Sequence, residues 1–153
     1  MKALFTLALL LLPASGSPDL SRDPEALMAA IERSVILPKD AEPLDAYGRN
    51  YAFAGPDMVV AIYLLPERPS NPDSGCEELR EDMTSRPCSK KDLEEMARDE
   101  AARLAAQTPA GERRWHKDPN GLPQTFDGGC TQVNVRFRIS TRSVERVACN
   151  GRA

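Results

Sequence analysis

The spacing of apolar and polar positions predicts two helices along the chain. Residues 23–38, DPEALMAAIERSVILP, carry apolar side chains at helical spacing on one face. Asp23 suits the N-cap, Pro24 suits the first helical position and Pro38 marks a stop. Residues 89–107, SKKDLEEMARDEAARLAAQ, begin with a Ser and an Asp spaced as in a capping box, but their apolar stripe is thin. We expect the first helix to pack on a sheet and the second to lie on the surface.

Strand patterns occur in two predicted hairpins. The first spans residues 44–66, where an alternating segment is followed by the turn AGPD and by the apolar run MVVAIYLLP, typical of a central strand. The second pairs residues 131–139 with residues 144–150 around the turn STRS. One face of the 131–139 strand is polar and carries Gln132, Asn134, Arg136 and Arg138.

The order of these elements predicts an α+β fold. We expect an N-terminal helix packed on a four-stranded antiparallel sheet, with residues 67–129 forming a disulfide-tethered helical excursion between the two hairpins. Residues 17–153 would then form one small domain. This outline is similar to cystatin-like folds in its element order, and such a likeness carries no function.

The first residues, MKALFTLALLLLPASG, have the form of a secretory signal peptide. A positive residue precedes an apolar run, and small residues follow it at the positions that a signal peptidase requires. The run is short for a membrane span, and an uncleaved anchor is the alternative. We expect residues 1–16 to be removed, leaving a periplasmic or secreted protein with no stable membrane span.

The charge balance narrows the range of partners. The formal charge of the chain is −3, and removal of residues 1–16 takes away one Lys and no acid, which makes it −4. Because phosphate binding needs a clustered positive field, a mildly acidic chain is not expected to bind nucleic acid.

An even number of cysteines in an exported chain predicts disulfides. Four cysteines allow three connectivities, and we favour the sequential one because both of its loops are short. Zinc coordination is the alternative, but the chain has no C-x-x-C pair. The four residues are Cys76, Cys88, Cys130 and Cys149.

The second of these pairs meets a geometric difficulty. A tight turn within STRS would place Cys149 opposite Asn134, too far from Cys130 for a bond. A bend or bulge at Gly128 and Gly129 would remove the difficulty.

The motif DGGC, followed by a strand with the alternation V-x-V-x-F and by a returning strand that ends VACNG, resembles small exported bacterial proteins without assigned function. The resemblance covers mainly residues 127–151. It transfers no activity, but it favours pairing of Cys130 with Cys149.

Residues for enzymatic chemistry are scarce in this chain. It has a single His and no G-x-S-x-G, P-loop or Rossmann glycine pattern, so we expect no catalytic activity and no cofactor. His116 with Asp118 and Asp127 is a candidate for a weak oxygen-rich cation site. Since DPNG is better explained as a turn, no metal site is predicted.

The stretch RRWHK at residues 113–117 is the main candidate for contact with a partner. A Trp offers a large apolar surface, and neighbouring Arg and Lys side chains suit carboxylate, phosphate or sulfate groups. The alternative is that the Trp folds back over the sheet edge while the basic side chains are simply solvated. The candidate binding residues are Arg113, Arg114, Trp115, His116 and Lys117, with Arg136 and Arg138 extending the positive surface.

Two functional hypotheses follow from these observations. The first is an exported, non-catalytic binding or structural protein that contacts an anionic envelope component or protein through residues 113–117. The second is a small secreted enzyme or enzyme inhibitor with a sheet-face pocket around Tyr47, Arg49 and Tyr51, although such side chains are also common as cross-strand pairs.

Overall fold

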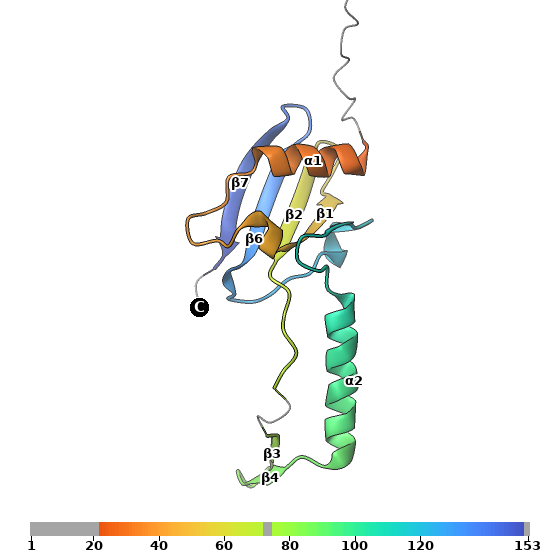
Figure 1. Ribbon diagram of the computed structural model, residues 1–153, viewed down its shortest axis with the longest axis vertical. Coiled ribbons are helices and arrows are strands. Elements are labelled where there is room, and N and C mark those ends of the chain that lie inside the picture. The colour runs from red at the N-terminus through yellow and green to blue at the C-terminus, as the bar shows by residue number, and fades with distance from the viewer. Residues whose placement is uncertain (1–21, 72–74, 152–153) are drawn as a thin grey trace, which may run out of the picture.

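The computed structural model describes residues 22–71 and 75–151, and the predicted signal peptide lies outside these ranges. Within them the chain has the expected α+β class, with two α-helices, a five-stranded main sheet and a two-stranded hairpin (Figure 1). The strand order in the main sheet is β5-β1-β2-β6-β7. The elements are α1 (Pro24–Ser34), η1 (Leu44–Ala46), β1 (Gly48–Phe53), β2 (Met58–Leu64), β3 (Glu77–Leu79), β4 (Ser85–Pro87), α2 (Lys90–Ala106), β5 (Arg113–Trp115), η3 (Pro119–Gly121), β6 (Gly129–Arg138) and β7 (Ser143–Asn150).

Helix α1 begins where the sequence predicts and ends earlier. Asp23 is the N-cap, and its side chain accepts a hydrogen bond of 3.2 Å from the backbone N–H of Glu25. The last helical residue is Ser34, and Val35 is already extended. The helix ends early for a local reason. Two β-branched residues follow Ser34, and Pro38 disfavours helical geometry in the residue before it.

The main sheet differs from the expected four antiparallel strands. Those strands are present and adjacent, but β5 adds a fifth that runs parallel to β1, so the sheet is mixed. In this pairing Arg49 lies opposite Arg113, and Tyr51 lies opposite Trp115. A strand of three residues shows too little alternation to be predicted, and its pairing depends on a distant part of the chain.

The core lies between α1 and the sheet face beneath it. Leu27, Met28 and Ile31 of the helix are buried against alternate side chains of the strands. The hydroxyl of Tyr51 donates to Glu32 at 2.8 Å, and it lies 3.4 Å from the hydroxyl of Tyr63. Burial raises the pKa of Tyr63 to about 12 and also raises the pKa of Tyr51. The fully buried large side chains are Tyr47, Tyr51, Tyr63, Phe137, Leu27, Ile31, Val59, Val133 and Val135.

The difficulty with Cys130 and Cys149 is resolved by the register of β6 and β7. The pairing shifts once between Arg136 and Phe137 and again between Gly129 and Val133, so Cys149 lies opposite Val133. The second shift brings the two cysteines together as a disulfide with a Cα–Cα distance of 4.5 Å. The expected bend is therefore present, and Gly129 adopts a positive φ of 54° within it.

Residues 66–71 and 75–107 form an extension, here called the arm, that projects away from the main sheet (Figure 1). None of the described residues of β3, β4 and α2 is buried. Residues 66–71 run beside α2 and are joined to it by hydrogen bonds. The N–H of Glu67 donates to Gln107 Oε1 at 2.7 Å, and the N–H of Ser70 donates to Glu100 Oε1 at 2.6 Å. The arm therefore has almost no apolar core of its own.

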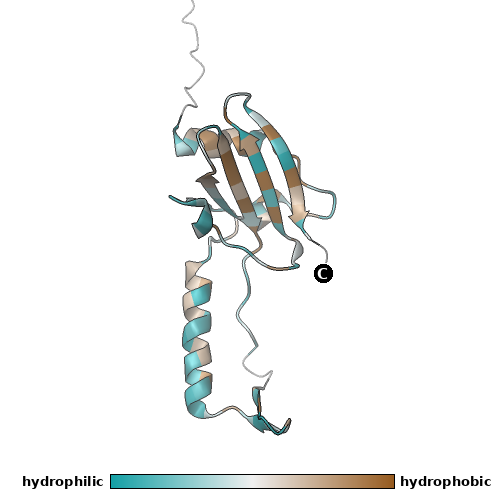
Figure 2. Cartoon of the chain, turned by 180° about the vertical axis from the view of Figure 1, so that it is seen from behind, coloured by the Kyte–Doolittle hydropathy of each residue, from teal (hydrophilic) through white to brown (hydrophobic). Residues whose placement is uncertain are grey.

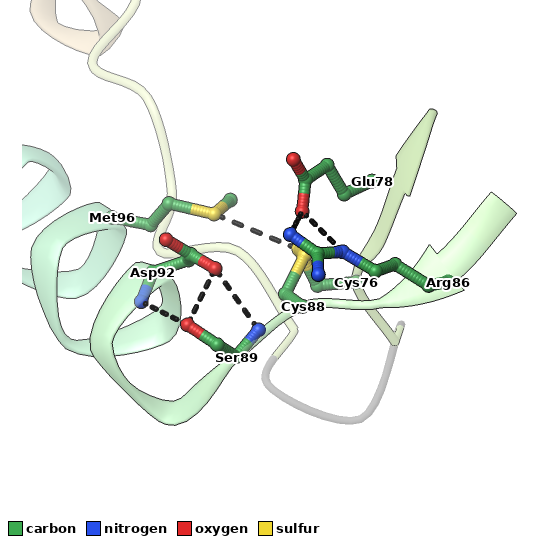
Figure 3. The surroundings of a disulfide bond; sticks show 7 residues. All are labelled: Cys76, Glu78, Arg86, Cys88, Ser89, Asp92 and Met96. Carbon is green, nitrogen blue, oxygen red and sulfur yellow. Dashed lines mark hydrogen bonds and ion pairs between the residues drawn. A yellow bond between two sulfur atoms is a disulfide. The ribbon is translucent and has the colours of Figure 1, made fainter. Parts of the chain in front are cut away.

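The far end of the arm holds the second disulfide, Cys76–Cys88, whose Cα atoms are 5.4 Å apart (Figure 3). The predicted capping box follows directly: the N–H of Asp92 donates to Ser89 Oγ at 3.3 Å, and the N–H of Ser89 donates to Asp92 Oδ2 at 3.0 Å. Met96 of α2 reaches back to the disulfide, with its Sδ 3.7 Å from Cys76 Sγ (Figure 3). In the ranges that the structure describes, no helix has the length and apolar character that a membrane crossing requires.

Candidate functional site

The main sheet has one covered face and one open face. Helix α1 covers the first, and Figure 2 views the second, where no helix of the described chain lies over β2, β6 and β7. Because side chains alternate along a strand, the odd-numbered residues of β1 point toward α1 and the even-numbered ones point toward the open face. We call the second surface the open face below.

The alternation of β5 separates the residues that the sequence groups together. Trp115 lies on the α1 side at the sheet edge, where it stacks on Tyr51 with ring centroids 6.4 Å apart and meets Phe53 edge-on at 4.8 Å. Arg114 and His116 belong to the open face. Residues 113–117 therefore do not present one continuous contact surface.

Arg113 takes part in a polar cluster at the edge of α1. Its guanidinium lies 3.2 Å from Glu25 and 3.8 Å from Glu32. Glu32 also pairs with Arg49 at 3.1 Å, and only 16% and 11% of these two side chains are exposed. These groups neutralise one another, so they fasten β1 and β5 to the helix.

The face around Tyr47, Arg49 and Tyr51 is covered. Both tyrosines are 0% exposed, and the hydroxyl of Tyr47 donates to the carbonyl of Cys130 at 2.7 Å. Arg49 donates to the carbonyl of Gly111 in addition to its ion pair with Glu32. Helix α1 fills the space that a pocket on this face would need.

Two arginines stand opposite each other on the open face. Arg136 of β6 pairs in register with Arg146 of β7, and both side chains are exposed. Among the residues that the structure describes, no carboxylate lies within ion-pair distance of either one. Like charges directly across two strands destabilise a sheet. The pair is therefore an uncompensated positive site.

The other predicted binding arginine of β6 is already paired with acidic side chains of the same chain. Arg138 lies 3.3 Å from Asp57 and also forms an ion pair with Glu145. Hydrogen bonds from Ser140 and the ion pair with Arg138 hold the pKa of Asp57 below its usual value. Lys117 is exposed.

An apolar strip lies beside the arginine pair. In register, Val60 of β2 lies between Ala52 of β1 and Arg136 of β6. Leu122, just after η3, packs over Ala52 and Ile62 and is 7% exposed. The open face thus joins an apolar strip to a positive edge.

A pocket of about 220 Å³ opens at the other end of this face, where the arm meets the sheet. Its polar centre is Asn50, which is 2% exposed. Asn50 Oδ1 accepts from Thr108 Oγ1 at 2.7 Å and lies 2.9 Å from His116 Nε2. The lining residues are Asn50, Leu64, Pro66, Ala106, Gln107, Thr108, Arg114, His116, Gly121 and Pro123.

The hydrogen bonds of Asn50 determine which nitrogen of the His116 imidazole carries the proton. Asn50 Nδ2 points to the carbonyls of Gly48 and Ile62, at 3.2 and 3.4 Å, so the group that faces His116 is the oxygen. His116 Nε2 must therefore donate, which leaves Nδ1 as the free nitrogen of the neutral ring. Burial and the charge of Arg114 lower the pKa of His116.

The lowered pKa of His116 predicts a pH-dependent stability. The unfolded chain binds the proton more readily than the folded chain does. The contribution of neutral His116 to the free energy of unfolding is therefore complete above the ordinary pKa of 6.5 and is lost as the pH falls below it. We expect the free energy of unfolding of the wild type to fall between pH 7.5 and pH 5 more steeply than that of His116→Gln. Urea unfolding at a series of pH values measures both slopes, and equal slopes would contradict the assignment.

The weak cation site considered from the sequence is not assembled. Asp118 caps η3 by accepting from the N–H of Asn120 at 2.8 Å, as expected for a turn. Within residues 22–71 and 75–151 no three His, Cys, Asp or Glu side chains are grouped in a way that would hold a metal ion.

Sequence reasoning found only part of the open face. Arg136 is in the predicted set, but Arg146 is missed, because a tight turn within STRS would place it opposite Phe137 and only the register shift between Arg136 and Phe137 brings it opposite Arg136. Asn50 and Thr108 are also missed, because 58 residues separate them and only the fold brings them together. Comparison with known protein families, curated proteins and solved structures gives no match for this chain.

Proposed function

We propose that this chain is an exported, non-catalytic binding protein whose open face holds an anionic partner. The observation that carries the proposal is the uncompensated cross-strand pair Arg136 and Arg146. The two disulfides indicate an oxidising compartment. Together with the signal-like N-terminus they support a periplasmic or secreted location.

The chemistry of the open face favours an acidic protein segment as the partner. Two adjacent guanidiniums suit carboxylates, which they bind with charge-assisted hydrogen bonds. Val60 lies next to Arg136 and is partly exposed, so it offers an apolar contact that a polypeptide of alternating acidic and apolar residues can use on one face. A polysaccharide offers no apolar side chains for this strip, and the acidic net charge of the chain disfavours nucleic acid.

Reversal of one charge should separate binding from stability. Arg146→Glu places a carboxylate opposite Arg136, so we expect the free energy of unfolding to rise by about 0.5 kcal/mol. Binding of a short peptide of alternating Glu and Leu should weaken by about tenfold or more, because one guanidinium is lost and the other is neutralised. Urea unfolding and fluorescence anisotropy of the labelled peptide measure the two effects.

Arg68→Glu is the matched control, since it makes the same change of charge at an exposed position in the arm. It should leave peptide affinity within about twofold of the wild type, apart from the long-range charge effect. Equal losses in both variants, or tight binding of dextran sulfate in place of the peptide, would contradict an acidic protein segment held at the arginine pair.

A further inference from the structure

We propose that the pocket at the base of the arm is a separate binding site for a small organic carboxylate. The pocket is formed by the sheet residues Asn50 and Leu64, the strand residue Arg114 and the turn that follows η3. Three strand spacings of about 4.8 Å, or roughly 14 Å, separate Arg114 on β5 from the strand β6 that carries Arg136. This site does not depend on the function proposed for the arginine pair.

One side-chain hydrogen-bond donor of the residues that line this pocket, Gln107 Nε2, has no acceptor in the described part of the chain. The one polar oxygen at its centre, Asn50 Oδ1, already receives hydrogen bonds from both Thr108 and His116. Gln107 uses its Oε1 to accept from Glu67, while its Nε2 is buried with no acceptor among the described residues. A buried donor without an acceptor costs about 1–3 kcal/mol. A ligand that supplies an oxygen acceptor would remove this cost.

Among ligands that supply an oxygen acceptor, the positive charge of Arg114 favours an acid. Arg114 donates to the carbonyls of Ala106 and Gln107, at 2.8 and 3.3 Å, at the C-terminal end of α2. No carboxylate of the described chain pairs with it. Its positive charge also lowers the pKa of His116. A carboxylate in the pocket would meet the guanidinium of Arg114, and a rotation of the Gln107 side chain would bring its buried amide donor to the ligand as well.

The size and lining of the pocket limit the rest of the ligand. The volume of about 220 Å³ is below the range of roughly 300–1,000 Å³ for pockets that hold drug-sized molecules. Leu64, Pro66, Ala106 and Pro123 supply an apolar wall. The site therefore suits a compact acid with an apolar body, of which benzoate is a convenient probe.

The position of the pocket gives the ligand a structural consequence. Pro66 begins the arm, and Ala106 and Gln107 end it, and all three line the pocket. A ligand seated there contacts both connections of the arm to the sheet. Occupation of the pocket would therefore restrict the direction in which the arm projects.

The single His of the chain is a direct reporter for this site. We expect benzoate to shift the imidazole NMR signals of His116 saturably, with a dissociation constant of about 1 mM for so small a ligand. It should also raise the pKa of His116, because it adds a negative charge near the ring. Benzamide, the neutral analogue, should bind at least about tenfold more weakly. Equal binding of the two, or no saturable shift, would overturn the carboxylate assignment.

Two variants locate the binding. A Cβ at Gly121 meets only His116 Nδ1 at 3.9 Å, so Gly121→Leu can be accommodated and fills the pocket. Gln107→Leu removes the unpartnered donor. Both should reduce benzoate binding by about tenfold or more, whereas Ala101→Leu on the exposed surface of α2 should leave it unchanged. Arg146→Glu should also leave it unchanged, so failure at this site is distinguishable from failure of the arginine pair. Undiminished binding to Gly121→Leu would overturn the location.

Discussion

Gly48→Ala is expected to lower the free energy of unfolding by about 3 kcal/mol or more. A Cβ at this position would overlap the backbone oxygen of Thr108 and would stand 2.7 Å from its carbonyl carbon. Because the obstacle is backbone, no side-chain rotation relieves the clash. The segment that returns from α2 would have to move away from β1. That movement would separate Thr108 from Asn50, now joined by a buried hydrogen bond of 2.7 Å, and would displace β5.

Trp115, the only Trp of the chain, lies in β5 and reports this displacement. We expect Gly48→Ala to shift its fluorescence emission to longer wavelength as well as to lower the urea midpoint. Gly121→Ala is the control, since an added Cβ there has room. It should change the free energy of unfolding by less than about 0.5 kcal/mol. A similarly small change for Gly48→Ala would show that the two segments do not pass so closely.

The elements that periodicity predicts are those whose burial is decided locally. The apolar stripe of α1 and the alternation in β6 each reflect one buried face, so the α+β class follows from the sequence. The strands β3, β4 and β5 have three residues each and are mostly polar and exposed. Their pairing is fixed by a disulfide or by a distant strand, and neither leaves a periodic pattern.

The same difference between local patterns and long-range pairing explains which residues of the candidate site the sequence predicts. The clear alternation of its strand predicts Arg136, whereas residues 113–117 have the sequence pattern of one loop. Once they pair with β1, adjacent side chains must point to opposite faces. Trp115 therefore joins the core side and His116 joins the open face. The side-chain partner of His116 is Asn50 of β1, which also accepts from Thr108 just after the arm, and no local pattern in the sequence connects these segments.

Removal of the two disulfides should have unequal effects, although their loops are of similar size. The sequence separations are 19 for Cys130–Cys149 and 12 for Cys76–Cys88, so the loop-entropy model assigns about 3 kcal/mol to each. The Cys130–Cys149 bond joins β6 to β7 inside the main sheet, where Cys149 packs against the core. We expect its double Ala variant to lose about 3 kcal/mol of global stability in urea unfolding followed by Trp115 fluorescence.

The Cys76–Cys88 bond closes the far end of the arm, where the described residues of β3, β4 and α2 are not buried. Its loss can loosen the arm without exposing any of the core. The double Ala variant should therefore keep the Trp115 unfolding midpoint of the wild type and become more susceptible to trypsin within the arm. Equal losses of global stability in the two variants would mean that the arm and the main sheet unfold as one cooperative unit. In that case the arm would be part of the fold rather than an attachment to it.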